Sequence, residues 1–175
     1  MELAIVKFLN RNFRFLNPAT KFISHIPFLV IFWSALTLSL ATLLGGRNGL
    51  ELIAAYCISL AIHFLVIKKI TDRFVARRKR PFEVWPEEII PIGQLQGASS
   101  FPSGHTLAMT AIATVYSSLI TGIWPFMLAM VIIIALARLH NGMHYPSDVL
   151  GGAVFGFIYG IIGLFAANYV ISVIG

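Results

Sequence analysis

The stretch from residue 106 to residue 137 carries no charged side chain, and this feature limits most strongly what the chain can fold into. A surface helix of a soluble protein keeps charged residues on its outer face, whereas a helix that crosses a bilayer needs about 20 mostly apolar residues. The stretch is too long for one crossing, and Gly122 and Pro125 interrupt it. It therefore predicts two short membrane-spanning helices, at about 103–120 and 123–139.

Three more apolar stretches are long enough to cross a bilayer, at about 27–46, 51–67 and 147–173. The chain of 175 residues is 58% hydrophobic and only 11% charged, whereas soluble domains average about 25% charged residues. Several of its faces are too apolar to be left in water. We therefore predict an all-α fold, a polytopic membrane helix bundle of about five transmembrane helices, in a single domain over residues 1–175.

The N-terminal segment, residues 1–24, differs from these stretches because Lys7, Arg11 and Arg14 recur among its apolar residues. Such a mixture is typical of an amphipathic helix that lies in the membrane interface, and it is unlike a cleavable signal peptide. A frayed tail is the alternative. We expect an interfacial amphipathic helix here, followed by the bundle.

Three clusters of polar residues lie at the ends of the predicted spans. They are Arg73-x6-Arg80-Pro81 after the second span, Pro102-Ser103-Gly104-His105 at the start of the third, and Arg138-x5-His144-x3-Asp148 between the fourth and fifth. No crossing separates the first cluster from the second, and two crossings separate the second from the third. All three therefore lie on one side of the membrane, which indicates a single site.

The arginines and the start of the third span suit a phosphate group. A guanidinium presents a planar fork that matches phosphate oxygens, and Arg73, Arg80 and Arg138 supply three such forks. Ser103 and Gly104 are expected to place backbone N–H groups at a helix N-terminus, which is a ready anion site. Phosphoryl transfer depends mostly on such positioning and charge, so these five residues form the predicted substrate-binding set.

The two histidines and the aspartate suit the chemistry of that transfer. His144 and Asp148 are four residues apart and share a face if a helix has begun there. The carboxylate is then predicted to accept the Nδ1 proton and leave Nε2 as the nucleophile. His105 is the predicted general acid for the leaving oxygen, and later the base for the attacking water. Together these residues predict hydrolysis through a phosphohistidine.

The three clusters resemble the signature of the type 2 phosphatidic acid phosphatase superfamily, which also includes the vanadium haloperoxidases. The family pattern is Lys-x6-Arg-Pro, then Pro-Ser-Gly-His, then Ser-Arg-x5-His-x3-Asp, and the resemblance covers about residues 50–160, the motif-bearing core. Two positions depart from it, since Arg73 replaces the lysine and Ala137 replaces the serine. The resemblance implies the same roles for the catalytic and phosphate-binding residues named above.

Within that superfamily the chain looks most like bacterial membrane phosphatases acting on lipid A 1-phosphate, prenyl pyrophosphate or phosphatidylglycerophosphate. The resemblance implies a multi-pass protein of the bacterial inner membrane with its active site on the periplasmic face. Metal and other cofactors are not expected, because the arginines supply the charge. The positive-inside rule favours the cytoplasm instead, because the side with the clusters holds every Lys and Arg except Arg47.

The expected partners are a lipid phosphate substrate and the phospholipid bilayer. The net charge of +6 could suggest nucleic acid, but the basic residues cluster between apolar spans, where anionic headgroups are the nearer partners. Glycines at positions 152, 156 and 160 suit close helix packing. This packing is expected within one chain, with a dimer seam as the alternative, so the protein is expected to be a monomer or a weak homodimer.

Other interpretations stay open at this point. A catalytically inactive lipid-binding or transport protein could keep the same anion site, and bound vanadate would give a haloperoxidase. His140, His144 and Asp148 could instead bind a metal, and Ser103 near His105 could suggest a serine hydrolase, although no Gly-x-Ser-x-Gly elbow is present. The remaining basic residues after the second span are expected to be interfacial anchors; they are Lys68, Lys69, Arg77, Arg78 and Lys79.

Overall fold

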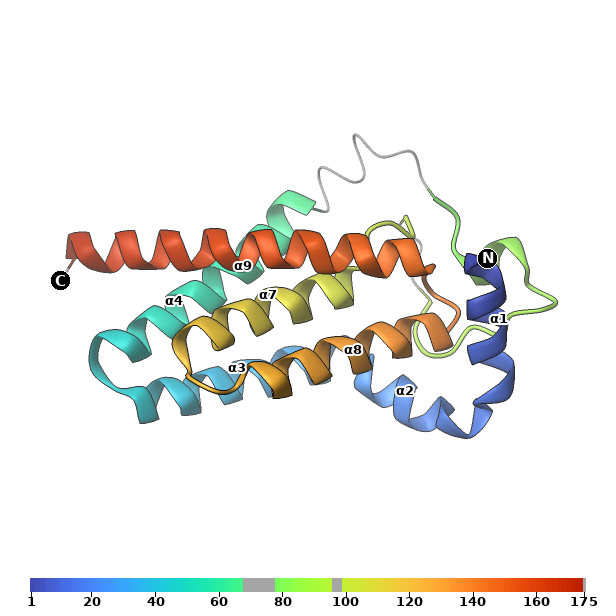
Figure 1. Cartoon of the computed structure of the whole chain (residues 1–175), viewed down its shortest axis with the longest axis horizontal. Helices are drawn as coiled ribbons and strands as arrows, with labels where there is room; N and C mark the ends of the chain where they lie inside the picture. Colours follow the sequence, from blue (N-terminus) through green and yellow to red (C-terminus); the bar gives the residue numbers. More distant parts are fainter. Residues whose placement is uncertain (68–77, 96–98, 175) are drawn as a thin grey trace.

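Five long helices form the body of the protein and run alongside one another (Figure 1). The computed structural model describes residues 1–67, 78–95 and 99–174, and these ranges contain helices and connecting loops but no strand. The long helices are α3 (Ile26–Leu44), α4 (Gly46–Ile62), α7 (Gly104–Leu119), α8 (Trp124–His140) and α9 (Pro146–Ile174). They coincide with the five predicted spans to within a few residues, so the predicted all-α bundle is confirmed.

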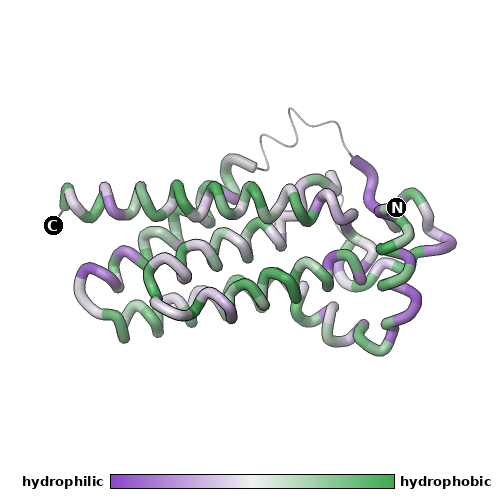
Figure 2. Tube along the Cα trace, viewed as in Figure 1, coloured by the Kyte–Doolittle hydropathy of each residue, from purple (hydrophilic) through white to green (hydrophobic). Residues whose placement is uncertain are grey.

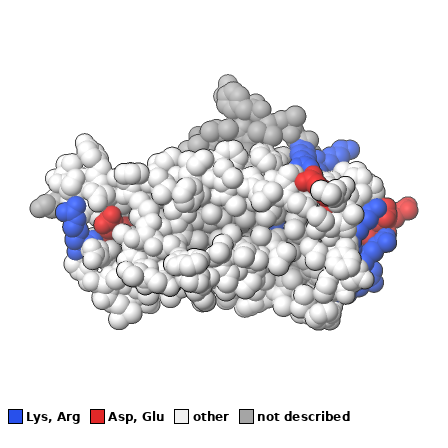
Figure 3. Space-filling model, in the orientation of Figure 1, with Lys and Arg blue, Asp and Glu red and all other residues white. Residues whose placement is uncertain are grey.

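The outer helices have the length and composition of membrane spans. Ile26–Leu44, Gly46–Leu65 and Pro146–Ile174 are each long and apolar enough to cross a bilayer, and α8 is a shorter apolar helix. Hydrophobic residues follow the length of the bundle, and hydrophilic residues gather toward its ends (Figure 2). Charged side chains on the face shown in Figure 3 lie mostly at the two ends, as expected where a protein meets lipid headgroups.

The central helix α7 is shielded from the surroundings by its neighbours. It contacts α9, α8 and α4, and eight of its sixteen residues are buried. A helix in this position faces protein rather than lipid, so it can carry Thr106, Thr110 and Thr114 without exposing their hydroxyls to a bilayer. The Thr110 and Thr114 hydroxyls donate to helix carbonyls one turn earlier.

The packing of α9 against α7 is close because glycines lie along the contact. A side-chain carbon at Gly152 would come within 2.6 Å of the Ser103 carbonyl oxygen, and one at Gly156 would meet the Leu107 carbonyl oxygen. The glycine stripe is therefore covered within the chain, which favours the expected intramolecular packing over a dimer seam. This contact also brings the start of α9 to the start of α7, where two of the polar clusters lie.

The N-terminal segment lies across one end of the bundle and is anchored there (Figure 1). It comprises α1 (Glu2–Asn12), a 3-10 turn η1 (Arg14–Leu16) and α2 (Asn17–Ile23). Asn10 is 2% exposed, and its Nδ2 donates to the carbonyl oxygens of Ile90 (2.9 Å) and His140 (2.8 Å). Its orientation across the bundle axis is the one predicted for an interfacial helix, and these bonds argue against a frayed tail.

Candidate active site

The second and third polar clusters and the described part of the first, Arg80-Pro81, meet at the end of the bundle that carries α1 and α2. The second cluster opens α7, the third occupies the turn between α8 and α9, and Arg80 immediately precedes the short helix α6 (Pro81–Val84). Of the eight predicted site residues, Arg73 lies outside the described residues. The other seven include His144, and contacts or charges place four of them near its buried ring. These four are Arg80, Asp148, Arg138 and His105.

The imidazole of His144 is held in one orientation by hydrogen bonds at both ring nitrogens. Its Nδ1 lies 2.7 Å from the Ser100 carbonyl oxygen, and its Nε2 lies 3.2 Å from Nη1 of Arg80. A carbonyl oxygen only accepts and a guanidinium only donates, so Nδ1 carries the proton and Nε2 keeps its lone pair. The predicted nucleophilic tautomer is therefore the one that the surrounding bonds favour.

The charge state of His144 also suits the predicted role of a nucleophile. Its side chain is 1% exposed. Burial lowers the pKa of His144 well below its usual value, and the positive charges of Arg138 and Arg80 lower it further. The ring is therefore neutral at ordinary pH, and the Nε2 lone pair is available to a phosphorus atom.

Asp148 supports His144 by a different route from the one predicted. The Nδ1 atom is 3.9 Å from Asp148 Oδ2, which is too far for a hydrogen bond. Instead the Ser100 hydroxyl donates to Oδ2 (2.5 Å), and the Ser100 carbonyl accepts the Nδ1 proton. The prediction assumed that His144 and Asp148 share a helix face, but α9 begins at Pro146 and leaves His144 in the preceding turn.

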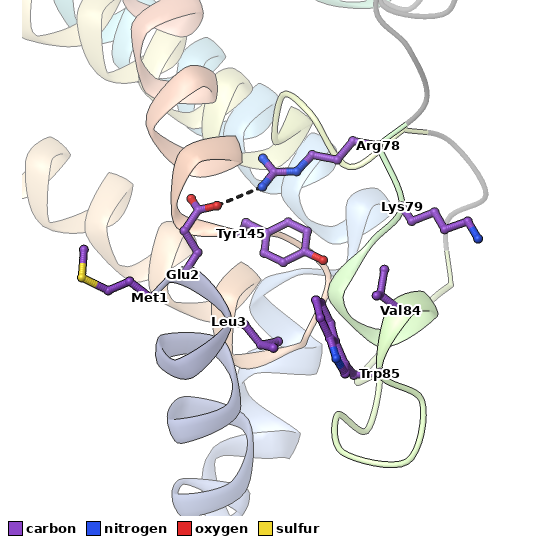
Figure 4. A pocket seen from close by; sticks show the side chains of 8 residues that line it. All are labelled: Met1, Glu2, Leu3, Arg78, Lys79, Val84, Trp85 and Tyr145. Carbon is purple, nitrogen blue, oxygen red and sulfur yellow. Dashed lines mark hydrogen bonds and ion pairs between the residues drawn. The ribbon is translucent and has the colours of Figure 1, made fainter.

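Arg78 neutralises the buried Asp148, so its prediction as an interfacial anchor was wrong. Its Nη1 lies 2.6 Å from Asp148 Oδ1 and 2.7 Å from the Ser147 hydroxyl, and its Nη2 lies 2.9 Å from Glu2 Oε2. The guanidinium stacks over the ring of Tyr145, 4.2 Å from the ring centroid. Figure 4 shows Arg78 with Glu2 and Tyr145 at one side of an outer pocket of about 460 Å³. Arg78 thereby joins α1 to the start of α9.

Glu2 completes this connection from the other side. Its Oε1 accepts the backbone N–H of Ser147 at 2.8 Å, which satisfies one of the free N–H groups in the first turn of α9. Hydrogen bonds from Ser147 and from Arg78 lower the pKa of Glu2 below its usual value. The carboxylate therefore stays ionised at neutral pH and holds the N-terminus of α1 beside the site.

Two arginines are buried close to His144. Arg80 is 2% exposed, and its guanidinium donates to the carbonyl oxygens of Met143 (3.0 Å) and Ser99 (3.3 Å). Arg138 is 3% exposed, and within the described residues its Nε and Nη2 have no hydrogen-bond partner. Unsatisfied buried donors on a cation are costly unless a ligand pairs with them. An anion next to Arg138 would supply that pairing.

The start of α7 offers fewer donors than predicted. The helix begins at Gly104 with Ser103 as its N-cap. The Ser103 N–H donates to the Asp148 carbonyl oxygen at 2.9 Å, so the prediction that this N–H is open to an anion was wrong. The Ser103 hydroxyl accepts from Thr106 at 3.1 Å, which leaves its own proton to donate. The Gly104 N–H lies in the first turn, where no intrahelical partner exists.

His105 lies on the same turn of α7 and is oriented by the N-terminal segment. Its Nε2 donates to the Ser24 carbonyl oxygen at 2.9 Å. This bond leaves Nδ1 as the ring nitrogen that could exchange a proton with a substrate. The ring therefore depends on the end of α2 for its orientation, which the sequence motif alone does not indicate.

His140 serves the fold rather than a metal site. Its Nδ1 lies 3.0 Å from the Leu9 carbonyl oxygen, and its Nε2 lies 2.9 Å from Asn17 Oδ1. Both ring nitrogens are thus occupied by the N-terminal segment. In the described ranges no group of three potential metal-binding side chains gathers, so the alternative of a metal held by His140, His144 and Asp148 finds no support in this geometry.

Comparison with known proteins identifies the family of the chain. The pattern of the PAP2 superfamily matches residues 48–171, which is most of the chain. The chain belongs to the PAP2 superfamily. Its fold is similar to that of the transmembrane PAP2-type phosphatidylglycerolphosphate phosphatase of Bacillus subtilis, with a TM-score of 0.68 and 17% identity over 96% of this chain and 85% of the other. That likeness concerns the fold alone.

Curated relatives within the PAP2 superfamily are phosphatases. Decaprenylphosphoryl-5-phosphoribose phosphatase of Mycobacterium tuberculosis is 32% identical over 140 residues, 80% of this chain and 74% of the relative. Lipid A 1-phosphatase of Rhizobium johnstonii is 33% identical over 63 residues, 36% of this chain. The latter match spans only about a quarter (26%) of the relative's length. The chain is thus a member of a superfamily in which the relatives it matches are phosphatases.

Three residues that support this arrangement are not among the predicted site residues. Ser100 links His144 to Asp148, Arg78 neutralises Asp148, and Glu2 holds Arg78. Ser100 lies two residues before Pro102, and Arg78 lies two residues before Arg80. This closeness to motif residues was the one indication in the sequence that they belong to the site. Glu2 is 145 residues from its partner Ser147, and no sequence pattern pointed to it.

Proposed function

We propose that this PAP2 protein hydrolyses a phosphomonoester or pyrophosphate on a membrane lipid through a phosphohistidine at His144. The observation that carries the proposal is the bonding of His144, which fixes the proton on Nδ1 and directs the Nε2 lone pair toward Arg80. The unsatisfied donors of Arg138 lie in the same buried region and suit the oxygens of the transferred group. Both features serve phosphoryl transfer better than simple lipid binding.

The first step of the proposed reaction transfers the phosphoryl group to the protein. The Nε2 lone pair of His144 attacks phosphorus, a P–N bond forms, and the bond from phosphorus to the lipid-side oxygen breaks. His105 donates a proton to that oxygen, so the lipid leaves as an alcohol, or as a monophosphate if the substrate was a pyrophosphate. The incoming phosphoryl group replaces the contact between Arg80 and His144, and Arg80 then donates to a phosphoryl oxygen.

The second step releases phosphate. A water oxygen attacks the phosphorus of the phosphohistidine, His105 accepts a proton from that water, and the P–N bond breaks. Arg80 and Arg138 stabilise the negative charge on the equatorial oxygens in both steps. Asp148 accepts from the Ser100 hydroxyl, and the Ser100 carbonyl keeps the proton of His144 on Nδ1 in both steps.

A lipid substrate is supported by the position of the site at the end of apolar spans and by the relatives. The named relatives are phosphatases of lipid A and of decaprenylphosphoryl-5-phosphoribose. The candidates are lipid A 1-phosphate, a prenyl pyrophosphate and phosphatidylglycerophosphate. We infer that the headgroup enters the site while the tail stays beside the apolar helices.

The test is phosphate release by purified protein from a panel of these lipids together with phosphatidic acid. Wild type should release phosphate from at least one of them. His144→Asn keeps a donor for the Ser100 carbonyl but has no Nε2, so its release should fall to background while its thermal stability stays close to wild type. If neither protein releases phosphate but both bind a lipid phosphate, the catalytic proposal is wrong and the chain is an inactive lipid-binding or transport protein.

We further propose that the protein lies in a bacterial inner membrane with this site on the periplasmic face. Support comes from the resemblance to bacterial lipid phosphatases, whereas the basic residues at the same end argue for the cytoplasm. A single cysteine placed at Leu95, in a Cys57→Ser background because Cys57 is exposed, decides between them. Labelling by an impermeant thiol reagent in spheroplasts supports the periplasm, and labelling only after lysis supports the cytoplasm.

A further inference from the structure

A cavity of about 370 Å³ lies beside the candidate active site and reaches Arg138. Its walls come from the end of α2, the start of α3, the loop at 92–94 and the last turn of α8. The residues that line it are Lys21, Ser24, His25, Ile26, Ile92, Gly93, Gln94 and Arg138. Two of them, Lys21 and Arg138, are basic and none is acidic, so the cavity suits an anion.

Arg138 forms the deep wall of this cavity. Its side chain is 3% exposed, and its Nε and Nη2 have no partner within the described residues. These donors point to a ligand, because a buried guanidinium normally satisfies them with protein or water. Arg138 is already assigned to the phosphoryl group in the proposed reaction, so this residue is shared between the proposed reaction site and the cavity.

Lys21 lines the same cavity from the last turn of α2, outside the motif-bearing core. Its side chain is exposed. Its stem runs past Gly93, whose φ of +91° favours glycine, and a side-chain carbon there would lie 3.9 Å from Lys21 Cγ. Ser24 adds a hydroxyl that accepts from Asn141 Nδ2 at 3.1 Å and keeps its own proton to donate. These groups lie on the α2 side of the cavity.

One phosphoryl group does not fill this space. With the bridging oxygen included, its five heavy atoms occupy at most about 150 Å³ if each takes a water's share of about 30 Å³, which is less than half of the 370 Å³ cavity. The remaining volume adjoins Lys21, His25 and the first residue of α3, Ile26. Since α3 is a membrane-span candidate, a lipid lying along it would place its headgroup here.

We propose that this cavity binds a second anionic group of the lipid headgroup, adjacent to the phosphoryl group that is cleaved, and that Lys21 is the residue that selects for it. The proposal rests on the proposed phosphatase function. The ligand class is a lipid diphosphate, or a phosphomonoester joined through a short linker to a phosphodiester. Lys21 acts in binding, so its loss affects KM more than kcat.

The experiment compares Lys21→Gln with wild type on two matched pairs of lipids. Farnesyl pyrophosphate is paired with farnesyl phosphate, and phosphatidylglycerophosphate with phosphatidic acid. Loss of a charge-assisted contact should raise KM about tenfold for the member of a pair with two anionic groups, and less than about threefold for the member with one. The pair that shows this difference identifies the source of the second anion.

Arg14→Gln is the control, because it removes one positive charge from the same N-terminal segment without lining the cavity. For each pair of lipids, the ratio of the two KM values in Arg14→Gln should equal the ratio in wild type. Equal effects of Lys21→Gln on both members of each pair, no effect at all, or the same effect from Arg14→Gln would each overturn the proposal.

A binding measurement keeps this proposal separate from the phosphatase function. Equilibrium binding of both pairs of lipids is measured in the His144→Asn protein, with and without Lys21→Gln. If Lys21→Gln selectively weakens binding of the member with two anionic groups in either pair, the second-anion site is supported even if wild type hydrolyses no lipid tested. If the two members of each pair bind equally, with or without Lys21→Gln, the site is refuted even if wild type is an active phosphatase.

Discussion

Replacing Arg78 with methionine should damage catalysis through Asp148, although Arg78 is not expected to touch the substrate. Asp148 is fully buried, and Arg78 Nη1 lies 2.6 Å from its Oδ1. Asp148 also accepts from the Ser100 hydroxyl and from the Tyr145 N–H at 2.7 Å. Arg78→Met removes the opposite charge and leaves those two donors in place.

The size of the effect follows from burial. Breaking a fully buried ion pair costs about 3–5 kcal/mol, but the Arg78 side chain is 33% exposed, so water can replace part of its interaction. We expect a loss of about 2 kcal/mol in stability, close to the cost of one hydrogen bond to a charged group. The partner contact to Glu2 is exposed and adds less than about 1 kcal/mol.

The effect on rate follows from the path between Arg78 and the imidazole. Without Arg78, the Asp148 carboxylate is expected to shift. Since Asp148 accepts from the Ser100 hydroxyl, Ser100 then moves as well, and its carbonyl oxygen holds Nδ1 of His144. Misplacement of a reacting group by about 1 Å costs up to about a hundredfold in rate. We therefore expect kcat to fall about tenfold to a hundredfold, with KM nearly unchanged.

The assay measures kcat and KM for phosphate release together with the melting temperature in detergent. Glu2→Gln is the matched control, because it removes the charge from the outer contact to Arg78 and keeps an amide oxygen that accepts from the Ser147 N–H; it should lower kcat less than about threefold. A wild-type kcat in Arg78→Met would refute the positioning role. A raised KM at unchanged kcat would show instead that Arg78 contacts the substrate.

Three further results are expected. Gly156→Ala should cost about 1–3 kcal/mol in thermal stability, because its side-chain carbon meets the Leu107 carbonyl oxygen; Val154→Ala, on an exposed position, is the control, and equal melting temperatures would contradict the close packing. Phosphate release should survive excess chelator, since the arginines supply the charge that a metal would bring, and a strict metal requirement would disprove this. Burial and the charges of Arg138 and Arg80 lower the pKa of His144 in the folded protein. As pH falls, the unfolded chain therefore takes up a proton on His144 at a higher pH than the folded protein does. Stability should therefore be lost as pH falls below about 6.5, and the melting temperature of His144→Asn should fall less between pH 7.5 and pH 5.5.

The spans could be predicted from the sequence because each is an uninterrupted apolar stretch bounded by charges or by glycine and proline. Their ends shifted by only a few residues, and α7 could be short because other helices surround it. The meeting of the second and third clusters could also be predicted, since counting crossings places both on one side of the membrane. Their contact then depends on the glycines of α9, which were visible in the sequence.

The hydrogen-bond partners could not be predicted, because they join segments far apart in the chain. Asn10 binds the carbonyl oxygen of His140, 130 residues away, and Glu2 binds Ser147, 145 residues away. The direct bond predicted from Asp148 to His144 failed for a local reason. The spacing of four residues implies a shared face only inside a helix, and α9 begins after His144.

The most direct test of the central claim is detection of phosphate on His144 during turnover. Wild-type protein and His144→Asn are mixed with a lipid substrate that carries a ³²P-labelled terminal phosphate, quenched with alkali within milliseconds, and digested for peptide mapping. The proposed reaction predicts alkali-stable, acid-labile label on the peptide that contains His144 in wild type, and none in His144→Asn. Phosphate release without any protein-bound label at the shortest times would contradict it, because water would then attack the lipid phosphate directly.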